Sequence, residues 1–115
     1  MKHKIIDVVS GREFIRVSRT ISAALGIDAA AVVGLLAALE LDNGKWFDAT
    51  YEQIAAELGI SESRVARSVK TLSELGFVDV VRSDIPCRTY YSVNPGEVIA
   101  FITDAVEEPR VGGDE

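Results

Sequence analysis

The feature that most constrains the fold is a pair of short predicted helices in the middle of the chain, with almost no chain between them. Thr50 and Gln53 match the capping-box pattern, in which the two side chains satisfy free backbone N–H groups at a helix start. This first helix ends at Gly59, a residue suited to the tight turn after a helix. Ser61 is placed to cap a second helix, which Gly76 stops. The two helices are therefore held close to each other.

Two short helices joined by such a turn form a helix-turn-helix. Projection of the second helix at about 100° per residue places Val65, Val69 and Leu72 on one stripe, which predicts a buried face. The opposite face carries Ser63, Arg67, Lys70 and Glu74, with Arg64 and Thr71 on its shoulders. An apolar stripe backed by hydroxyls and cations suits a helix that enters the major groove of DNA. The alternative is that these charges only solvate an exposed helix.

The rest of the chain predicts helices before this motif and a β-hairpin after it. A helix at Ser18–Leu25 ends at Gly26, and Asp28 is placed to cap an almost wholly apolar helix from Ala29 to about Leu41. Lys45–Phe47 predicts a short extended piece whose aromatic side chains turn inward. The remaining predicted elements are strands at Phe77–Arg82 and Thr89–Val93 and an amphipathic helix at Val98–Val106.

This order of elements predicts an α+β fold of the winged helix-turn-helix type, in which a three-helix core carries a small antiparallel hairpin as its wing. Ile5–Val9 and Phe14–Val17 predict a short hairpin or two extended pieces ahead of the core. The expected divisions are an extended or hairpin segment at 1–17, the winged helix-turn-helix at 18–94, a carboxyl-terminal helix at 95–107 and a disordered acidic tail at 108–115.

The composition offers nothing for an enzyme. One cysteine, Cys87, rules out an internal disulfide and a Cys-rich zinc site, and the one histidine, His3, lies at the amino terminus. The glycines are scattered and form no phosphate loop, so we expect no catalytic residue, metal or cofactor, and no small-molecule ligand is evident. The longest apolar stretch, Ala29–Leu39, has 11 residues (39 − 29 + 1). A bilayer span needs about 20, so we expect a cytoplasmic protein without a membrane anchor.

The net charge of −6 speaks at first sight against a nucleic-acid partner, because binding to phosphates depends on lysine and arginine. The charge is unevenly distributed, however. Residues 1–20 carry five basic and two acidic side chains, and residues 61–95 carry five basic and four acidic ones. Residues 21–60 and 96–115 each carry one basic and six acidic side chains. This pattern is compatible with one basic face on an otherwise acidic body.

A resemblance to winged-helix proteins covers the chain from about Phe14 to Ile102. Their helix-turn-helix and first wing strand resemble EQIAAELGISESRVARSVKTLSELGFVDV. The segment IPCRTYYSVN resembles the wing and second strand of the winged-helix domains of phage and plasmid replication proteins, including the DnaD-like and RepA-like amino-terminal domains. The segment FIRVSRTISAALGIDAAAVVGLLAAL is similar to the part that precedes the helix-turn-helix in those domains. The resemblance implies binding of double-stranded DNA through the helix Ser61–Leu75, with the wing loop Arg82–Arg88 touching the backbone or minor groove. It implies a role in transcriptional regulation or in DNA replication of a phage- or plasmid-type element. Two features depart from the pattern, namely the acidic total and a wing tip, Asp84-Ile85-Pro86, without lysine or arginine.

We therefore predict sequence-specific contacts with double-stranded DNA. The predicted contact residues are Thr50, Ser61, Ser63, Arg64, Arg67, Lys70, Thr71, Arg82 and Arg88. Among them, Arg64 and Arg67 have the fork geometry that recognises O6 and N7 of guanine. A homodimer is also expected, because the apolar helix Ala29–Leu39 and the terminal helix offer surface for a second copy, and two recognition helices about one DNA turn apart give specificity. The alternative is a winged-helix protein–protein interaction module without DNA binding.

Overall fold

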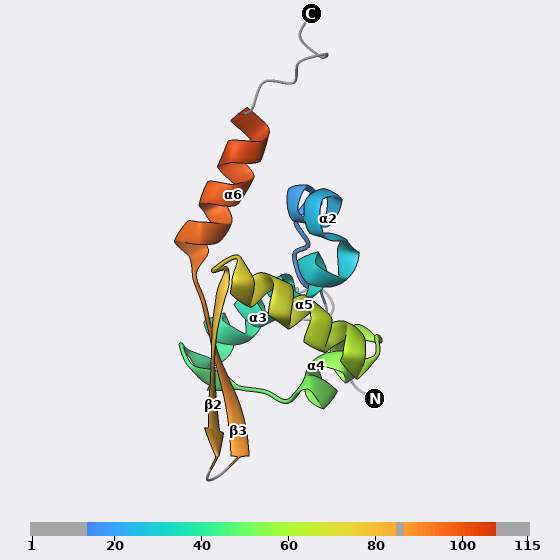
Figure 1. The fold of residues 1–115 in the computed structure, drawn as a ribbon, viewed down its shortest axis with the longest axis vertical. Coiled ribbons are helices and arrows are strands. Elements are labelled where there is room, and N and C mark those ends of the chain that lie inside the picture. Colours follow the sequence, from blue (N-terminus) through green and yellow to red (C-terminus); the bar gives the residue numbers. More distant parts are fainter. Residues whose placement is uncertain (1–13, 85–86, 108–115) are drawn as a thin grey trace, which may run out of the picture.

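The computed structural model describes residues 14–84 and 87–107. Within this part the chain is an α+β structure of five helices and a three-stranded antiparallel sheet (Figure 1). The elements are α2 (Arg19–Leu25), α3 (Ile27–Asn43), β1 (Phe47–Asp48), α4 (Tyr51–Leu58), α5 (Glu62–Glu74), β2 (Val78–Asp84), β3 (Cys87–Val93) and α6 (Pro95–Glu107). None of the helices in this described part is long and apolar enough to cross a bilayer.

Both ends of the chain carry predictions that fall outside the described residues. The hairpin expected within 1–17 falls mostly on residues 1–13, and the tail expected at 108–115 lies beyond the described part as well. Residues 14–17 are described and have no regular secondary structure. They run beside α3, where the backbone of Arg16 approaches Gly34 closely.

The boundary between α2 and α3 corrects one prediction. α2 begins as expected, with the Ser18 hydroxyl accepting a hydrogen bond from the Ile21 N–H at 3.1 Å. Asp28 does not cap α3, because Gly26 already occupies the cap position with a φ of 99° and the helix starts at Ile27. Asp28 therefore lies in the first turn of α3, with its carboxylate free to reach another element.

α4 and α5 form the predicted pair of short helices, and each begins at its predicted cap. The Thr50 hydroxyl accepts from the Gln53 N–H at 2.9 Å while the Gln53 side chain accepts from the Thr50 N–H at 2.8 Å, which completes the capping box. Gly59 closes α4 in the left-handed conformation with a φ of 72°. The Ser61 hydroxyl then caps α5 by accepting from the Arg64 N–H at 3.2 Å.

The sheet has the strand order β1-β3-β2, with both neighbouring pairs antiparallel. The hairpin strands are longer than predicted, because β2 continues to Asp84 and β3 begins already at Cys87. In Figure 1 this hairpin projects from the helices on the side opposite α6. The register pairs Val80 with Tyr91 and Val81 with Tyr90. Tyr91 is buried and Val81 is exposed, so the first pair lies on the inner face of the hairpin and the second pair on its outer face.

The core is built around α3, whose apolar residues contact α2, α4, α5 and the sheet. Tyr91 is fully buried and stacks on Phe47 with 5.6 Å between ring centroids, and burial raises the pKa of its hydroxyl. Tyr90 is only partly buried, as expected for alternation along a strand. Trp46 was predicted to point inward, and this is wrong. Its side chain is 45% exposed, because its positive φ of 61° turns the chain before Phe47 enters the core.

α6 leaves the end of β3 and extends away from the body of the molecule (Figure 1). It begins at Pro95, the first residue of the expected division 95–107 and three residues before the start that the amphipathic pattern predicted (98 − 95), because proline suits the first position of a helix. The Asn94 side chain donates to the Gly76 carbonyl at 2.8 Å, and the Asn94 N–H donates to the Phe77 carbonyl at 2.8 Å. Phe101 makes an edge-to-face contact with Phe77 at 5.3 Å. These contacts fix the start of α6 against the end of α5.

Candidate nucleic-acid interface

The candidate site is centred on α5, which the sequence pattern orients in the predicted way. Val65, Val69 and Leu72 are buried, with exposed fractions of 0%, 3% and 0%. The opposite side carries four exposed side chains, Ser63, Arg67, Lys70 and Glu74. Because the apolar stripe anchors α5 against the core, these four side chains face away from the protein. Ser68, which the projection left unassigned, is buried as well.

One flank of α5 faces the turn between α2 and α3. Arg64 forms a two-pronged pair with Asp28, with Nε to Oδ2 at 2.8 Å and Nη2 to Oδ1 at 2.6 Å. The hydrogen bond and the opposite charge lower the pKa of Asp28 and raise the pKa of Arg64. Beside this pair lies a hollow of about 350 Å³ whose lining includes Arg67 and Thr71. The Arg64 guanidinium is thus held in one direction by a partner from α3.

The other flank of α5 faces the hairpin. Arg82 on β2 donates from Nη2 to the Tyr51 hydroxyl at 2.7 Å, and its guanidinium carbon lies 5.9 Å from the centroid of that ring. A hollow of about 430 Å³ lies between these residues and α5, with Lys70 and Glu74 on its wall. The fold therefore brings the first residue of α4, the middle of α5 and the hairpin to one concave surface.

Arg82 and Arg88 do not share that surface. The register pairs Arg82 with Thr89 and Ser83 with Arg88, which puts the two arginines on opposite faces of the hairpin. Arg88 lies on the outer face, where its Nη1 donates to Oδ2 of Asp48 at 3.1 Å. Of these two arginines, Arg82 is the one that lines a hollow together with α5.

The predicted hydroxyl groups mostly serve the helices that carry them. Thr50 and Ser61 cap α4 and α5, and the Thr71 hydroxyl donates to the Arg67 carbonyl at 3.1 Å. The Ser63 hydroxyl lies 3.2 Å from that of Ser61, at the exposed start of α5. Both serines are exposed at the amino end of α5, and the amino end of a helix favours phosphate oxygens.

The cations of the site differ in how far they are already neutralised. Lys70 pairs with Glu74 one turn later at 2.7 Å, and this carboxylate raises the pKa of Lys70. Arg64 and Arg88 have carboxylate partners as described above, and Arg82 has a neutral one. Among the residues that the structure describes, the Arg67 side chain makes no hydrogen bond or ion pair and is exposed. Arg67 is therefore the cation best placed to meet an incoming acceptor.

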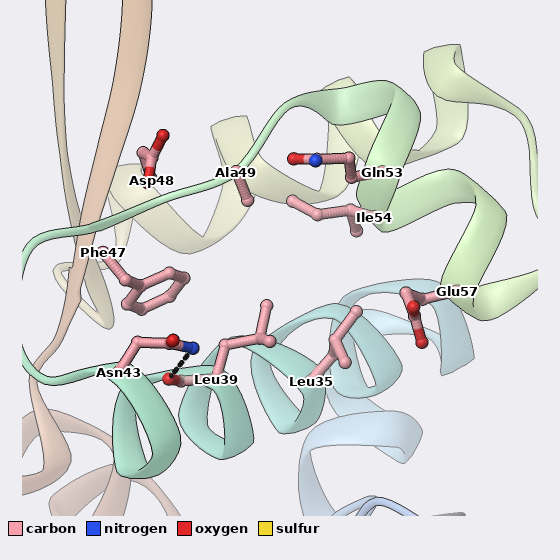
Figure 2. A pocket seen from close by; sticks show the side chains of 9 residues that line it. All are labelled: Leu35, Leu39, Asn43, Phe47, Asp48, Ala49, Gln53, Ile54 and Glu57. Atoms are coloured by element: carbon pink, nitrogen blue, oxygen red, sulfur yellow. Dashed lines mark hydrogen bonds between the residues drawn. The ribbon is translucent and has the colours of Figure 1, made fainter.

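A further pocket of about 250 Å³ lies between α3, β1 and α4. Figure 2 shows Leu35 and Leu39 pointing up from α3 toward Phe47 and Ile54, with Glu57 near one end. None of its lining residues is basic or belongs to α5, so this pocket is not part of a phosphate-binding surface. Within residues 14–84 and 87–107, no group of three His, Cys, Asp or Glu side chains is arranged to hold a metal ion.

Three residues of the site were missed by sequence reasoning, namely Asp28, Asp48 and Tyr51. Asp28 was assigned to a cap and Tyr51 to an apolar helix face, while their partners Arg64 and Arg82 lie 36 and 31 residues away in the chain. No local pattern links residues at such separations. Only the packing of α3 on α5, and the approach of Arg82 on β2 to the first residue of α4, bring these pairs together.

Comparison with known proteins adds no assignment to this geometry. A scan against protein-family models finds no match for the chain, and a search of curated proteins finds none either.

Proposed function

We propose that the chain is a winged helix-turn-helix domain that binds double-stranded DNA by placing α5 in the major groove. The observation that carries this proposal is the exposed side of α5, where Ser63, Arg67 and Lys70 lie on a helix anchored by the buried stripe Val65, Val69 and Leu72. The order α3, β1, α4, α5, β2, β3 and the sheet order β1-β3-β2 support it, because they place an antiparallel hairpin beside the second helix of a helix-turn-helix.

The contacts divide by position along α5. Arg67 is unpaired in the described part of the chain and is assigned to a guanine edge or a phosphate. Lys70, further along the helix, is assigned to a phosphate, and Ser61 and Ser63 offer donors at the start of the helix. Arg82 reaches the backbone from the hairpin. By the resemblance of the sequence to phage and plasmid replication proteins, the role is transcriptional regulation or DNA replication of an element of that kind.

Binding of labelled duplex DNA, measured by fluorescence anisotropy between 50 and 200 mM salt, tests the proposal. A groove binder loses affinity steeply over this range, with a slope of about −0.9 per phosphate contact. Arg67→Ala is expected to weaken specific binding by roughly 5- to 150-fold, which corresponds to about 1–3 kcal/mol. Lys70→Ala is expected to weaken binding to all DNA sequences about equally, because a phosphate contact does not distinguish bases.

Lys45→Ala is the matched control for both variants. Lys45 is an exposed cation in the turn after α3, so this substitution removes the same charge away from α5. Circular dichroism must show that all three variants keep the fold. Equal binding by wild type and Arg67→Ala would show that α5 does not present this face to DNA.

A second function is favoured by one specific observation. Arg64, Lys70 and Arg88 are each already paired with a carboxylate, and the chain as a whole carries a charge of −6. Such a surface also suits a protein–protein interaction module that has the winged-helix fold without DNA binding. Absence of binding to random-sequence duplex at 50 mM salt favours this module, because nonspecific affinity is largest at low salt.

A further inference from the structure

The carboxyl-terminal helix α6 is apolar but poorly covered. Val98, Phe101 and Ile102 are half-buried against the core, whereas Ala100 is exposed and Ile99 is 61% exposed. By contrast, α3, the other strongly apolar helix, has six buried residues. Only one side of α6 meets the rest of the described chain, through Phe101 on Phe77 and through contacts with α2. The remaining apolar surface of α6 therefore lacks a partner within the described residues.

An apolar groove lies directly beside this helix. It holds about 280 Å³ between α2, α3 and the start of α6. In Figure 1, α2 and α6 stand apart at the top and α3 lies beneath them. The residues of α3 that line the groove include three with a small side chain or none, Ala30, Gly34 and Ala37, which recur along one side of the helix. Val98 and Ile99 form one wall, and the lining contains only two polar residues, Arg16 and Ser18.

The charges around the groove are sorted by sign. Arg16 lines the groove, and Arg19 is the first residue of α2, next to the lining residue Ser18, while α6 carries Glu97 and Asp104; all four side chains are exposed. None of these four forms an ion pair within the part of the chain that the structure describes. A helix with the composition of α6 therefore complements the groove in hydrophobicity and in charge. Its apolar side chains can cover the apolar lining, and its acidic side chains can face Arg16 and Arg19, the basic rim.

We propose that a second copy of this chain occupies the groove and forms a two-fold symmetric homodimer. The α6 helix of each copy lies against the groove of the other, with Ile99 in the contact. A hollow and an apolar helix on the same molecule allow such a reciprocal contact, in which the same surface serves on both sides. The dimer carries two copies of α5. Their joint use on one DNA duplex rests on the proposed function, whereas the dimer itself does not.

Light scattering coupled to size exclusion at tens of micromolar tests the dimer on the full chain. Wild type is expected to run at twice the 12.4 kDa of one chain. Ile99→Glu puts a carboxylate into the apolar contact and is expected to weaken self-association by roughly 30-fold or more. Leu41→Glu is the matched control, because Leu41 is 89% exposed on α3 and lies outside the groove. It is expected to remain dimeric.

A second pair of variants tests the basic rim with the same change of net charge in both, from −6 to −8 (−6 − 2). Arg19→Glu sets acid against acid and is expected to weaken the dimer, whereas Lys45→Glu makes the same charge change away from the groove and is expected to leave it intact. A wild-type mass near 12.4 kDa overturns the proposal, as does an Ile99→Glu variant that stays dimeric. Equal weakening by Arg19→Glu and Lys45→Glu also overturns it, because net charge and not the groove then governs association.

DNA binding separates this proposal from the proposed function. If the dimer forms and DNA is not bound, the function fails and the interface stands. If Ile99→Glu is a monomer that still binds a single half-site through α5, both proposals stand. If wild type is a monomer that binds DNA, and Arg67→Ala weakens this binding, the function stands and the interface fails.

Discussion

Gly34 is predicted to be a position where alanine destabilises a helix. It lies in the middle of α3, where replacement of glycine by alanine ordinarily stabilises by about 0.5–1 kcal/mol. Here a Cβ would come closer than 3.0 Å to the Arg16 carbonyl oxygen and to 3.3 Å from its carbon. Because both atoms are backbone, no side-chain rotation relieves the contact.

The expected net effect follows from two opposing contributions. Overpacking against a fixed neighbour costs about 1–3 kcal/mol, which exceeds the helix-propensity gain of about 0.5–1 kcal/mol. Relief requires residues 15–18 to move away from α3, which draws Ile15 off the core and strains the Ser18 cap of α2. We therefore expect Gly34→Ala to lower the free energy of unfolding by about 0.5–2 kcal/mol.

Gly96→Ala is the matched control in the first turn of α6. A Cβ at Gly96 meets nothing within 4 Å, so this substitution is expected to stabilise by about 0.4–1 kcal/mol. Urea unfolding followed by circular dichroism, at one fixed protein concentration, measures both variants. If Gly34→Ala stabilises as much as Gly96→Ala, then residues 15–18 are not anchored on α3 and the reasoning is refuted.

Three further predictions concern the caps, the core and acid stability. Thr50→Ala removes one half of the capping box and is expected to cost about 1 kcal/mol in urea unfolding, whereas Thr50→Ser is expected to retain most of the stability. Leu72→Ala empties a site of 0% exposure and is expected to cost about 2–5 kcal/mol, and a smaller loss would indicate a loosely packed α5. Arg64 lowers the pKa of Asp28 below its ordinary 3.8, so the carboxylate contributes stability above that pH and loses it as the pH falls through the lowered value. Asp28→Asn is expected to flatten this acid-side decline in unfolding midpoint between pH 5 and pH 2, and an unchanged decline would contradict the pairing.

The elements that the sequence predicted correctly are those whose signals are local. The Thr50 and Ser61 caps, the end of α4 at Gly59 and the buried stripe of α5 each depend on residues within one or two turns of each other. Where prediction failed, a distant contact or an unusual backbone decided the outcome. Asp28 lies in the first turn of α3 and bonds to Arg64, and Trp46 points outward because its backbone adopts a positive φ. The winged-helix assignment, the DNA contacts and the dimer remain proposals.

The site itself was predictable only in part, for the same reason. Helical projection correctly separated the outward residues of α5 from the inward ones, since the periodicity of a single helix determines them. It could not show that Arg82 and Arg88 lie on opposite faces of the hairpin, because that depends on the register of β2 against β3. It also could not show which cations have carboxylate partners, because those partners belong to other elements.

The bond between Arg82 and the Tyr51 hydroxyl means that the hairpin and the first turn of α4 are not mechanically independent. Under the proposed function, a phosphate that approaches Arg82 competes with a neutral phenol and not with a carboxylate. Under that proposal Arg82 must release Tyr51 to reach the phosphate, and the hairpin then loses this contact with α4. The contact between β2 and the first turn of α4 is therefore one that a bound phosphate is expected to replace.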